Sequence, residues 1–321
     1  MEGLVTLKIL ITGANGFIGA NLVRSFIKKN ISIVALSSSN NLGWRLHSVR
    51  EKIEFYKCDI SNKESLEKVF KETLPNGVIH TAAFGGYPNQ IDEGKIFNTN
   101  LIGTTNLVNE AITNEVEWII NTGSSSEYGL KDKPMKETDI CEPTTSYGIS
   151  KLAGTLYAHS KGVLLNFPIF TFRIFSAYGP FEDPNRLIPY LFLKILKKEK
   201  PNLSNPRPVR DFIYIKDVVD AYIRLIKNYN SVKPGEIYNL GFGRSHKIKD
   251  VVDFLSEILN EEIEVDWGRQ EARVGDLMKL WEADIEKLNT TLKWNPKYNL
   301  KNGLNETYKW FLSHQNLYGD I

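Results

Sequence analysis

The sequence predicts an α/β fold: a doubly wound parallel sheet followed by a smaller C-terminal α/β lobe. Two patterns in the first half of the chain support this expectation. Short apolar runs rich in Ile and Val alternate with segments of helical periodicity, which is the pattern of repeated βαβ units. The apolar runs are continuous rather than alternating, as expected for strands covered on both faces.

The apolar runs and the helical segments give the expected elements of the first half. The strands are Leu7–Thr12, Ile31–Leu36, Ile53–Cys58, Gly77–Ala82 and Val116–Thr122. The helices are Ile18–Lys29, Ser61–Glu72, Gly94–Thr113 and Ser146–Lys161. Ser61 and Glu64 are three residues apart at the start of the second of these helices, which predicts a capping box.

After about residue 170 prolines become frequent and the rhythm changes. The strands expected here are Phe170–Phe175, Asp211–Ile215 and Glu236–Leu240, and the helices are Leu187–Lys198, Val218–Asn228, Lys249–Asn260 and Lys301–Ser313. Because no long linker interrupts the chain, we expect the second lobe to be interleaved with the first. Residues 1–170 with about 212–240 would form the dinucleotide-binding domain, and about 171–211 with 241–321 the second lobe.

Composition narrows the class of protein. The 321 residues carry 40 basic and 38 acidic side chains, a net charge of +2, which gives no electrostatic reason to expect nucleic acid or an anionic membrane as partner. No apolar run reaches the roughly 18–20 residues of a membrane helix, and the N-terminus resembles a first strand rather than a signal peptide. Cys58 and Cys141 have no metal-site spacing, so we expect reduced thiols, no metal and a cytoplasmic location.

A glycine-rich segment separates the first strand from the first helix. It contains Gly13, Asn15, Gly16, Phe17, Ile18 and Gly19. A tight strand-to-helix turn requires glycine, and a pyrophosphate must approach the backbone N–H groups at the helix N-terminus. With a strand before it and a helix and second strand after it, the segment predicts a Rossmann-type site for a nicotinamide dinucleotide.

The end of the second strand bears on which dinucleotide binds. An acidic residue there would bond the adenosine ribose and repel a 2′-phosphate, but the chain has Ser37, Ser38 and Ser39. These hydroxyls and Arg45 can bind a phosphate. We therefore favour NADP(H), with NAD(H) as the alternative. Asp59, at the end of the third strand, is expected either to bond the adenine amino group or to lie in a surface turn.

Tyr147 and Lys151 lie four residues apart on an expected helix and so share one face. A tyrosine can exchange a proton with a carbonyl or hydroxyl if a neighbouring ammonium lowers its pKa. The spacing Tyr-x-x-x-Lys also occurs at Tyr157, Tyr190 and Tyr229, but only Tyr147 begins a helix after the strand that ends near Ser124. Ser124 follows that strand, where ligands of such sheets bind, and could bond the substrate oxygen beside Tyr147.

These motifs resemble the extended short-chain dehydrogenase/reductases that act on nucleotide sugars, the NAD-dependent epimerase/dehydratase family. The resemblance covers nearly the whole chain. It is carried by Thr12–Gly19, Val78–Ala83, Asn98–Thr104, Ser124, Tyr147, Lys151, Arg173–Pro180, Arg210–Asp217, Arg273–Asp276 and Trp294–Pro296.

The resemblance implies roles for individual residues. Ser124, Tyr147 and Lys151 match the catalytic set, with Tyr147 and Lys151 also beside the cofactor. Further cofactor contacts are implied for Ile60, Ala82, Ala83 and Asn100. Substrate contacts are implied for Gly86 and Tyr87 in the loop after the fourth strand, for Ser125, for Ser176 where many members have Asn, and for Arg210 and Arg273, which match arginines that bind the diphosphate. His80 is expected to be a buried, hydrogen-bonded residue. A homodimer joined by the Gly94–Thr113 and Ser146–Lys161 helices is also implied.

Two departures from the family narrow the expected activity. The epimerases usually carry an acidic residue at the end of the second strand, where this chain has Ser37. The 4,6-dehydratases carry an acidic residue two or three positions before Tyr-Gly, where this chain has Ser125 and Ser126. The segment Gly123–Gly129 instead resembles that of 4-keto-6-deoxy-sugar reductases. We therefore expect an NADPH-dependent reductase that acts on the C4 ketone of a nucleotide-linked 4-keto-6-deoxyhexose. The alternatives are a 4-epimerase with tightly bound NAD, a 4,6-dehydratase, and a non-catalytic protein that senses NADP.

Overall fold

The computed structural model describes residues 7–268 and 280–318, and the chain divides into two compact units. The first unit consists of the chain up to Gly129, Ile140–Arg173 and Tyr222–Tyr238. The second consists of Leu130–Asp139, Ile174–Ala221 and the chain from Asn239 onward. Both units therefore contain segments that are far apart in the sequence.

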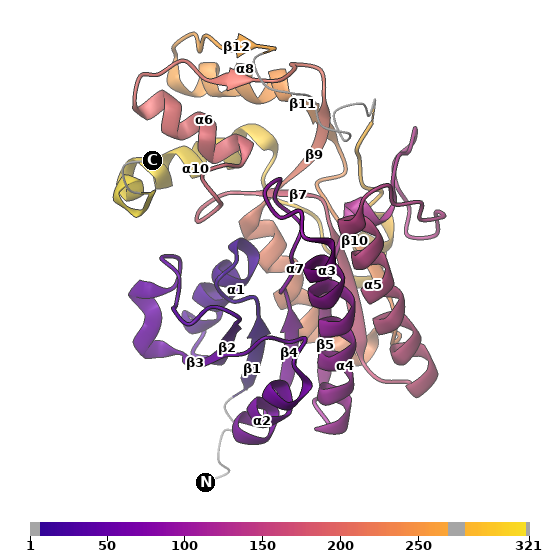
Figure 1. Cartoon of the computed structure of the whole chain (residues 1–321). Coiled ribbons are helices and arrows are strands. Elements are labelled where there is room, and N and C mark those ends of the chain that lie inside the picture. The colour runs from indigo at the N-terminus through magenta and orange to yellow at the C-terminus, as the bar shows by residue number, and fades with distance from the viewer. Residues whose placement is uncertain (1–6, 269–279, 319–321) are drawn as a thin grey trace. The chain divides into compact units, whose positions relative to one another are not determined.

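The main sheet has the strand order β10-β6-β5-β4-β1-β2-β3, and Figure 1 shows its strands between helices. The pairs β1–β2, β2–β3, β1–β4 and β4–β5 are all parallel. The chain thus starts in the middle of the sheet, extends to one edge and then crosses to the other side of β1. This confirms the expected doubly wound parallel sheet.

The strands of the main sheet follow the expected apolar runs to within a few residues. They are β1 (Lys8–Thr12), β2 (Ser32–Ser37), β3 (Glu54–Lys57), β4 (Gly77–His80), β5 (Trp118–Ser124), β6 (Ile169–Ile174) and β10 (Ile237–Leu240). The helices that connect them are α1 (Phe17–Ile27), α2 (Lys63–Thr73), α3 (Glu93–Phe97), α4 (Thr104–Thr113), α5 (Ser146–Leu165) and α7 (Ile215–Asn228). Short 3-10 helices are η1 (His47–Lys52), η3 (Ser125–Glu127) and η4 (Tyr229–Ser231).

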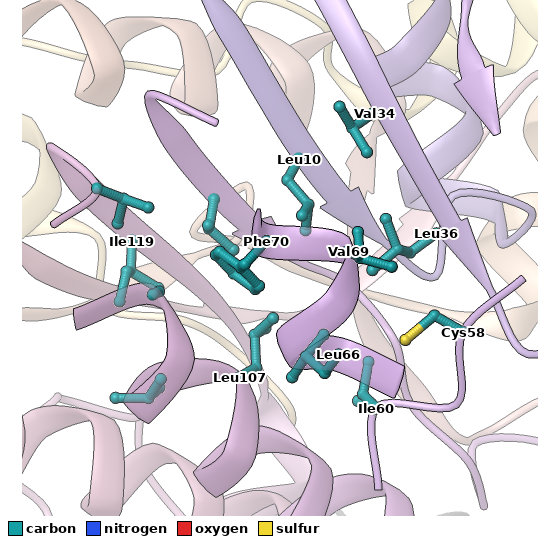
Figure 2. Packing of buried hydrophobic residues seen from close by; sticks show 14 of the residues in the cluster. Leu10, Val34, Leu36, Cys58, Ile60, Leu66, Val69, Phe70, Leu107 and Ile119 are labelled. Carbon is teal, nitrogen blue, oxygen red and sulfur yellow. The ribbon is translucent and has the colours of Figure 1, made fainter. Parts of the chain in front are cut away.

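A hydrophobic core fills one face of this sheet (Figure 2). Leu10, Val34 and Leu36 from the strands meet Phe70 from α2 and Leu107 from α4. Because successive side chains of a strand point to opposite faces, Ile9, Ile11 and Ile33 point away from this core and are buried on the other face. Burial on both faces explains why the apolar runs of these strands are continuous.

The N-terminus of α2 differs from the expectation. Its N-cap is Asn62, whose side chain accepts a hydrogen bond from the Ser65 N–H at 2.8 Å. The predicted capping box of Ser61 with Glu64 is wrong, because Asp59 binds Ser61 instead. The Asp59 carboxylate accepts from the Ser61 N–H (2.9 Å) and hydroxyl (2.7 Å).

The expected Gly94–Thr113 helix is interrupted by a π-helical segment, η2 (Asn98–Gly103), between α3 and α4. Such wide turns are rare and often occur at functional sites. In this case the segment contains Asn100, which is 1% exposed.

The second unit contains a three-stranded sheet of order β11-β9-β7 and a two-stranded one of β12 and β8. Its strands are β7 (Ser176–Tyr178), β8 (Asn202–Leu203), β9 (Val209–Tyr214), β11 (Ser245–Lys247) and β12 (Asp266–Trp267). Its helices are α6 (Leu187–Leu196), α8 (Ile248–Leu259), α9 (Glu286–Leu292), α10 (Leu300–His314) and η6 (Gln315–Tyr318). The short strands β7, β8, β11 and β12 and helix α9 were not expected from the sequence. No helix in the described ranges is long and apolar enough to cross a bilayer.

Candidate active site

The parallel strands bring several expected site residues to one edge of the sheet. In the ladder, Thr12 at the end of β1 is opposite Leu36 of β2 and His80 of β4. His80 in turn is opposite Asn121 of β5, three residues before Ser124. The loops that follow β1, β2, β4 and β5 therefore leave the sheet on the same side, where ligands bind in open α/β sheets.

The turn between β1 and α1 fits a dinucleotide. Gly13 has a φ of +64°, and a Cβ at this position would lie 2.6 Å from the Ala82 Cα. A Cβ on Gly19 would lie 2.5 Å from the Gly13 carbonyl oxygen. Gly16 caps α1, and no side chain fills the cap. The N–H groups of Phe17 and Ile18, in the first turn of α1, are thus suited to binding a pyrophosphate.

The loop after β2 is held against this turn by Asn15. The Asn15 amide donates to the Ser37 hydroxyl oxygen (3.1 Å) and to the Asn41 carbonyl (2.9 Å), and its own Oδ1 is buried with no hydrogen-bond partner among the described residues. The Ser37 oxygen also accepts from the Ser39 N–H at 3.2 Å, so its proton remains for donation to a ligand. Ser38 and Ser39 are exposed.

Arg45 lies beside the same turn. Its guanidinium donates to the Asn15 carbonyl at 3.3 Å and lies 4.5 Å from the centre of the Trp44 ring. Arg24 of α1 fixes the backbone here by donating twice to the Arg45 carbonyl, at 2.8 and 2.6 Å. Ser37 and Arg45 are therefore both in contact with Asn15.

Asn100 connects the loop after β4 to α5. Its amide accepts from the Phe84 N–H (2.9 Å) and donates to the Phe84 carbonyl (2.7 Å) and the Ser150 hydroxyl (2.9 Å). The Ser150 hydroxyl donates in turn to the Tyr147 carbonyl at 2.9 Å. These contacts link Asn100, expected beside the cofactor, to the backbone around Tyr147.

The loop after β4 contacts Tyr147 directly. A Cβ on Gly85 would lie 3.3 Å from the Tyr147 ring, and one on Gly86 would lie 3.9 Å from its hydroxyl oxygen. The Gln90 side chain accepts from the N–H groups of Gly85 (2.9 Å) and Tyr87 (3.3 Å) and so orders the loop. Gly86 is thus beside the expected catalytic tyrosine, and Tyr87 follows it in the same loop.

Ser124 is the N-cap of the short helix η3. Its hydroxyl oxygen accepts from the Ser126 N–H at 3.1 Å, which leaves its proton to donate. In return, the Glu127 carboxylate accepts from the Ser124 N–H at 2.8 Å. Ser125 is buried and Ser126 is partly exposed. The result is a rigid turn with the Ser124 side chain only partly buried.

Tyr147 and Lys151 lie on successive turns at the start of α5. Thr145 caps this helix by accepting from the Gly148 N–H at 3.1 Å. Lys151 is 4% exposed and donates to the Thr122 carbonyl at 2.6 Å. Burial lowers the pKa of Lys151 to about 8, and the Glu127 carboxylate opposes this shift by favouring the ammonium. Lys151 therefore remains mainly charged at pH 7.

His80 is buried between two threonines. One ring nitrogen lies 2.7 Å from the Thr12 hydroxyl and the other 2.9 Å from that of Thr104. Burial lowers the pKa of His80 to about 3, and the Lys151 charge acts in the same direction. The ring is thus neutral and fully hydrogen-bonded, as expected for a structural histidine.

The other three Tyr-x-x-x-Lys matches have hydroxyls engaged elsewhere. Tyr157 donates to the Asn109 side chain at 2.7 Å, and Tyr229 to Glu117 at 2.9 Å. The Tyr190 oxygen accepts from the Asn202 N–H at 3.0 Å. Each of these hydroxyls thus bonds a residue outside the expected site.

The remaining expected residues that the structure describes lie in the loops after β3 and β4 and in the second unit. Asp59 and Ile60 follow β3, Ala83 follows β4, and the Ala82 N–H lies 3.3 Å from the Thr12 hydroxyl. Ser176 and Arg210 belong to the three-stranded sheet of the second unit, where the Arg210 guanidinium lies 5.7 Å from the centre of the Trp281 ring. Arg273 lies outside the described residues.

Sequence reasoning missed a buried ion pair beneath the Ser124 turn. Glu127 on η3 is completely buried and accepts from the Arg173 Nε of β6 at 2.7 Å. Burial alone would lower the pKa of the Arg173 guanidinium, but Glu127 and Tyr128 beside it raise that pKa above its usual value. The only local sign of this pair was an acidic residue within an otherwise uncharged segment.

Comparisons with known proteins agree with this arrangement. Residues 9–241 match the model of the NAD dependent epimerase/dehydratase family. A UDP-glucuronate 4-epimerase of Thermodesulfobacterium geofontis is 27% identical, with 94% of this chain and 95% of the relative covered. A dTDP-glucose 4,6-dehydratase of Xanthomonas campestris is also 27% identical, with 95% and 93% covered.

Solved structures extend the similarity to three dimensions. The crystal structure of UDP-glucose 4-epimerase from Thermotoga maritima, with UDP-glucose, matches with a TM-score of 0.87 and 25% identity, covering 97% of this chain and all of the other. The family match spans well over half of the chain. The chain therefore belongs to the NAD dependent epimerase/dehydratase family of extended short-chain dehydrogenase/reductases, and is a nicotinamide-dependent enzyme of the oxidoreductase type.

Proposed function

We propose that this enzyme reduces the C4 ketone of a nucleotide-linked 4-keto-6-deoxyhexose with NADPH. The observation that carries the proposal is the Ser124–Tyr128 turn. The positions at which the family's dehydratases carry an acid are Ser125 and Ser126, and the one acid of the turn, Glu127, is fully buried against Arg173. No carboxylate of this turn is thus available to remove water from the sugar, whereas the hydroxyls needed to reduce a carbonyl are present.

The residues divide the chemistry among them. The bound reduced nicotinamide supplies a hydride to the C4 carbonyl carbon. Tyr147 donates its phenolic proton to the carbonyl oxygen, and the Ser124 hydroxyl donates a hydrogen bond to the same oxygen. The Lys151 ammonium stabilises the phenolate left on Tyr147. Gly86, Tyr87, Ser125, Ser176, Arg210 and Arg273 are proposed to bind the nucleotide sugar.

Replacement of Tyr147 tests the proton donor. We expect Tyr147→Phe to lower kcat by about 1,000-fold or more, because the ring remains while the proton is lost. Cofactor binding, followed by quenching of protein fluorescence, should remain within about two-fold of the wild-type value. Tyr157→Phe is the matched control and should keep wild-type kcat. An active Tyr147→Phe enzyme would refute the assignment.

The preference for NADPH is proposed from the loop after β2. It lacks an acid at Ser37, and Arg45 supplies a guanidinium beside Asn15. The ratio of kcat/KM for NADPH to that for NADH should exceed about ten and fall toward one in Arg45→Ala, because a guanidinium–phosphate pair contributes about 1.5–3 kcal/mol. Arg50→Ala, which removes an exposed arginine of η1, is the control. Equal kcat/KM with both cofactors in the wild type would contradict the proposal.

A nucleotide-sugar 4-epimerase with tightly bound NAD is the second candidate. It is favoured by the 4-epimerases among the relatives and by the family's description as NAD dependent. An epimerase would purify with NAD and interconvert two sugars without net consumption of cofactor. Release of the bound nucleotide by denaturation, followed by chromatography, distinguishes the two candidates.

We also propose a homodimer that involves α5. Ile149, Leu156 and Val163 are 44%, 50% and 49% exposed, and their spacing of seven residues places them in one stripe. Ile102 of the π-helical segment is also 44% exposed. Leu156→Glu should yield a monomer by light scattering, whereas Leu312→Glu on α10 should not. A monomeric wild type would contradict this proposal.

A further inference from the structure

We propose that Glu127 is a positioning residue of the active site: its buried carboxylate ties the Ser124 turn to the face of α5 that carries Lys151. Arg173 serves as its counter-ion. The inference deepens the proposed function, since it rests on Ser124 and Lys151 acting on the carbonyl oxygen and on Tyr147.

Three elements meet at this carboxylate. Glu127 Oε1 accepts from the Ser124 N–H at 2.8 Å and from the Thr155 hydroxyl at 3.0 Å, and Oε2 accepts from the Arg173 Nε at 2.7 Å. These donors come from the end of β5, from α5 and from β6. Thr155 lies one helical turn after Lys151 and therefore on the same face of α5. One side chain thus fixes the position of the Ser124 turn relative to the catalytic helix.

Two glycines allow the close packing that this arrangement needs. A Cβ on Gly123 would lie 2.6 Å from Glu127 Oε1, and one on Gly148 would lie 2.6 Å from the Ser126 carbonyl oxygen. The carboxylate therefore lies directly against the backbone of β5, and the first turn of α5 lies directly against η3. The Glu127 contacts thus join β5, η3 and α5, which are already closely packed. A small shift of η3 relative to α5 would move Ser124 relative to Tyr147.

The negative charge of Glu127 is balanced by the Arg173 guanidinium. Arg173 is 2% exposed, its guanidinium lies 4.6 Å from the centre of the Tyr128 ring, and its Nη1 has no hydrogen-bond partner in the part of the chain that the structure describes. Glu127 is therefore the ion-pair partner of a cation that is held out of water. A neutral residue at position 127 would leave this cation uncompensated, which is costly in a protein interior.

Glu127 also acts on Lys151 through its charge. Among the described residues, neutral His80 from β4 interacts with the Lys151 charge, and Tyr147 lies one turn earlier on α5. The Tyr222 hydroxyl from α7 lies 2.6 Å from that of Thr122, whose carbonyl accepts from Lys151. Arg173 from β6 faces Glu127. Removal of the carboxylate would take away the negative charge that favours the Lys151 ammonium, so the ammonium would become easier to deprotonate.

The test is Glu127→Gln, which keeps the shape of the side chain and removes its charge. We expect kcat for NADPH-dependent reduction of the sugar to fall roughly 10- to 100-fold, with KM within about two-fold. The alkaline limb of the kcat–pH profile should move to lower pH by roughly one unit, because the Lys151 ammonium is lost earlier. A purely structural role would not move this limb.

Two further variants serve as controls. Glu127→Asp keeps the charge, so the alkaline limb should return to its wild-type pH although the shorter side chain lowers kcat. Glu110→Gln changes a buried glutamate of α4 and should leave both kcat and the pH profile unchanged. If folded Glu127→Gln has the kcat and the alkaline limb of the wild type, the inference is overturned.

The inference remains testable if Glu127→Gln does not fold. The double variant Glu127→Gln/Arg173→Met removes both charges of the pair, so neither partner is left as an unpaired ion. It should fold and still show at least a ten-fold loss of kcat, because the tie of the Ser124 turn to β6 and the negative charge that acts on Lys151 are both lost. Wild-type kcat in this double variant would overturn the inference.

Failure of the proposed function gives a different result. If the wild type oxidises NADPH with none of the sugar substrates, the reductase proposal is refuted. The role of Glu127 can then still be tested through the midpoint of unfolding in urea. Glu127→Gln should then shift the midpoint less in a Lys151→Met background than in the wild type, because part of the lost interaction is with Lys151. Equal midpoint shifts in both backgrounds would overturn the positioning role alone.

Discussion

Glu127 in the first unit and Asp211 in the second are both fully buried carboxylates with three hydrogen-bond donors each, but the donors differ in kind. Glu127 accepts from a backbone N–H, a hydroxyl and the Arg173 guanidinium. Asp211 accepts from the backbone N–H groups of Phe242 (2.7 Å), Gly243 (3.0 Å) and Ala283 (3.0 Å). One carboxylate has a cationic partner, and the other is held by neutral dipoles.

The two carboxylates also differ in their electrostatic surroundings. Burial raises the pKa of Asp211 to about 7, although its three backbone donors favour the ionised form. In the first unit, by contrast, Glu127 and Arg173 form an ion pair, and Glu127 acts on the charge of Lys151. A buried carboxylate thus serves chemistry in one unit and holds loops together in the other.

Loss of Arg173 should produce the largest effect. Arg173→Met leaves the Glu127 carboxylate buried without its counter-ion, and such changes cost about 3–5 kcal/mol of unfolding free energy. Urea denaturation measures the loss, and the double variant Glu127→Gln/Arg173→Met should recover most of it. A loss below about 1 kcal/mol in Arg173→Met would show that the pair is not needed to keep the charge buried.

Asp211→Asn should have an intermediate effect. Asp211 Oδ2 accepts from both Gly243 and Ala283, and the amide nitrogen that can replace it accepts nothing. At pH 7 we expect a loss of about 2–3 kcal/mol in unfolding free energy, since buried unsatisfied donors cost about 1–3 kcal/mol each. The exposed Asp253, which pairs with Lys249 at 2.7 Å, offers the control: Asp253→Asn should cost less than about 1 kcal/mol.

The smallest expected effect is the change in the unfolding free energy per pH unit that arises from Asp211. Because the pKa of Asp211 is raised in the folded state, its contribution is full below the unfolded pKa near 4 and is lost as pH rises through about 7. The unfolding free energy of the wild type minus that of Asp211→Asn should therefore decrease by about 1 kcal/mol per unit between pH 5 and 7. A constant difference would mean that Asp211 does not titrate in this range.

The sequence was most informative where function needs local chemistry. Gly13 and Gly19 must be glycine because any Cβ would overlap the backbone, so the dinucleotide turn could be predicted from the glycine spacing together with the strand before it and the helix and strand after it. The position of Tyr147 in the first turn of a helix was also predictable. Both features depend on neighbours in the chain.

Features that depend on distant residues were not predictable in this way. Arg173 lies 46 residues from Glu127, so no local pattern reported the ion pair. Asn100 bonds both Phe84 and Ser150 through a π-helical turn that helical periodicity does not reveal. The predicted capping box of α2 was wrong for a local reason, because Asp59 accepts a hydrogen bond from the Ser61 hydroxyl. In each case, a tertiary contact or a competing side chain decided the structure.

Reduction of the C4 ketone is tested by following NADPH consumption together with formation of the sugar product. The purified enzyme would be mixed with NADPH and 4-keto-6-deoxyhexoses linked to CDP, GDP, dTDP or UDP, and the absorbance of the reduced nicotinamide followed while the product is identified. We predict that NADPH is consumed in equal amount to a 4-hydroxy sugar product with at least one of these substrates. Interconversion of sugars with bound NAD and no consumption of NADPH would contradict the claim.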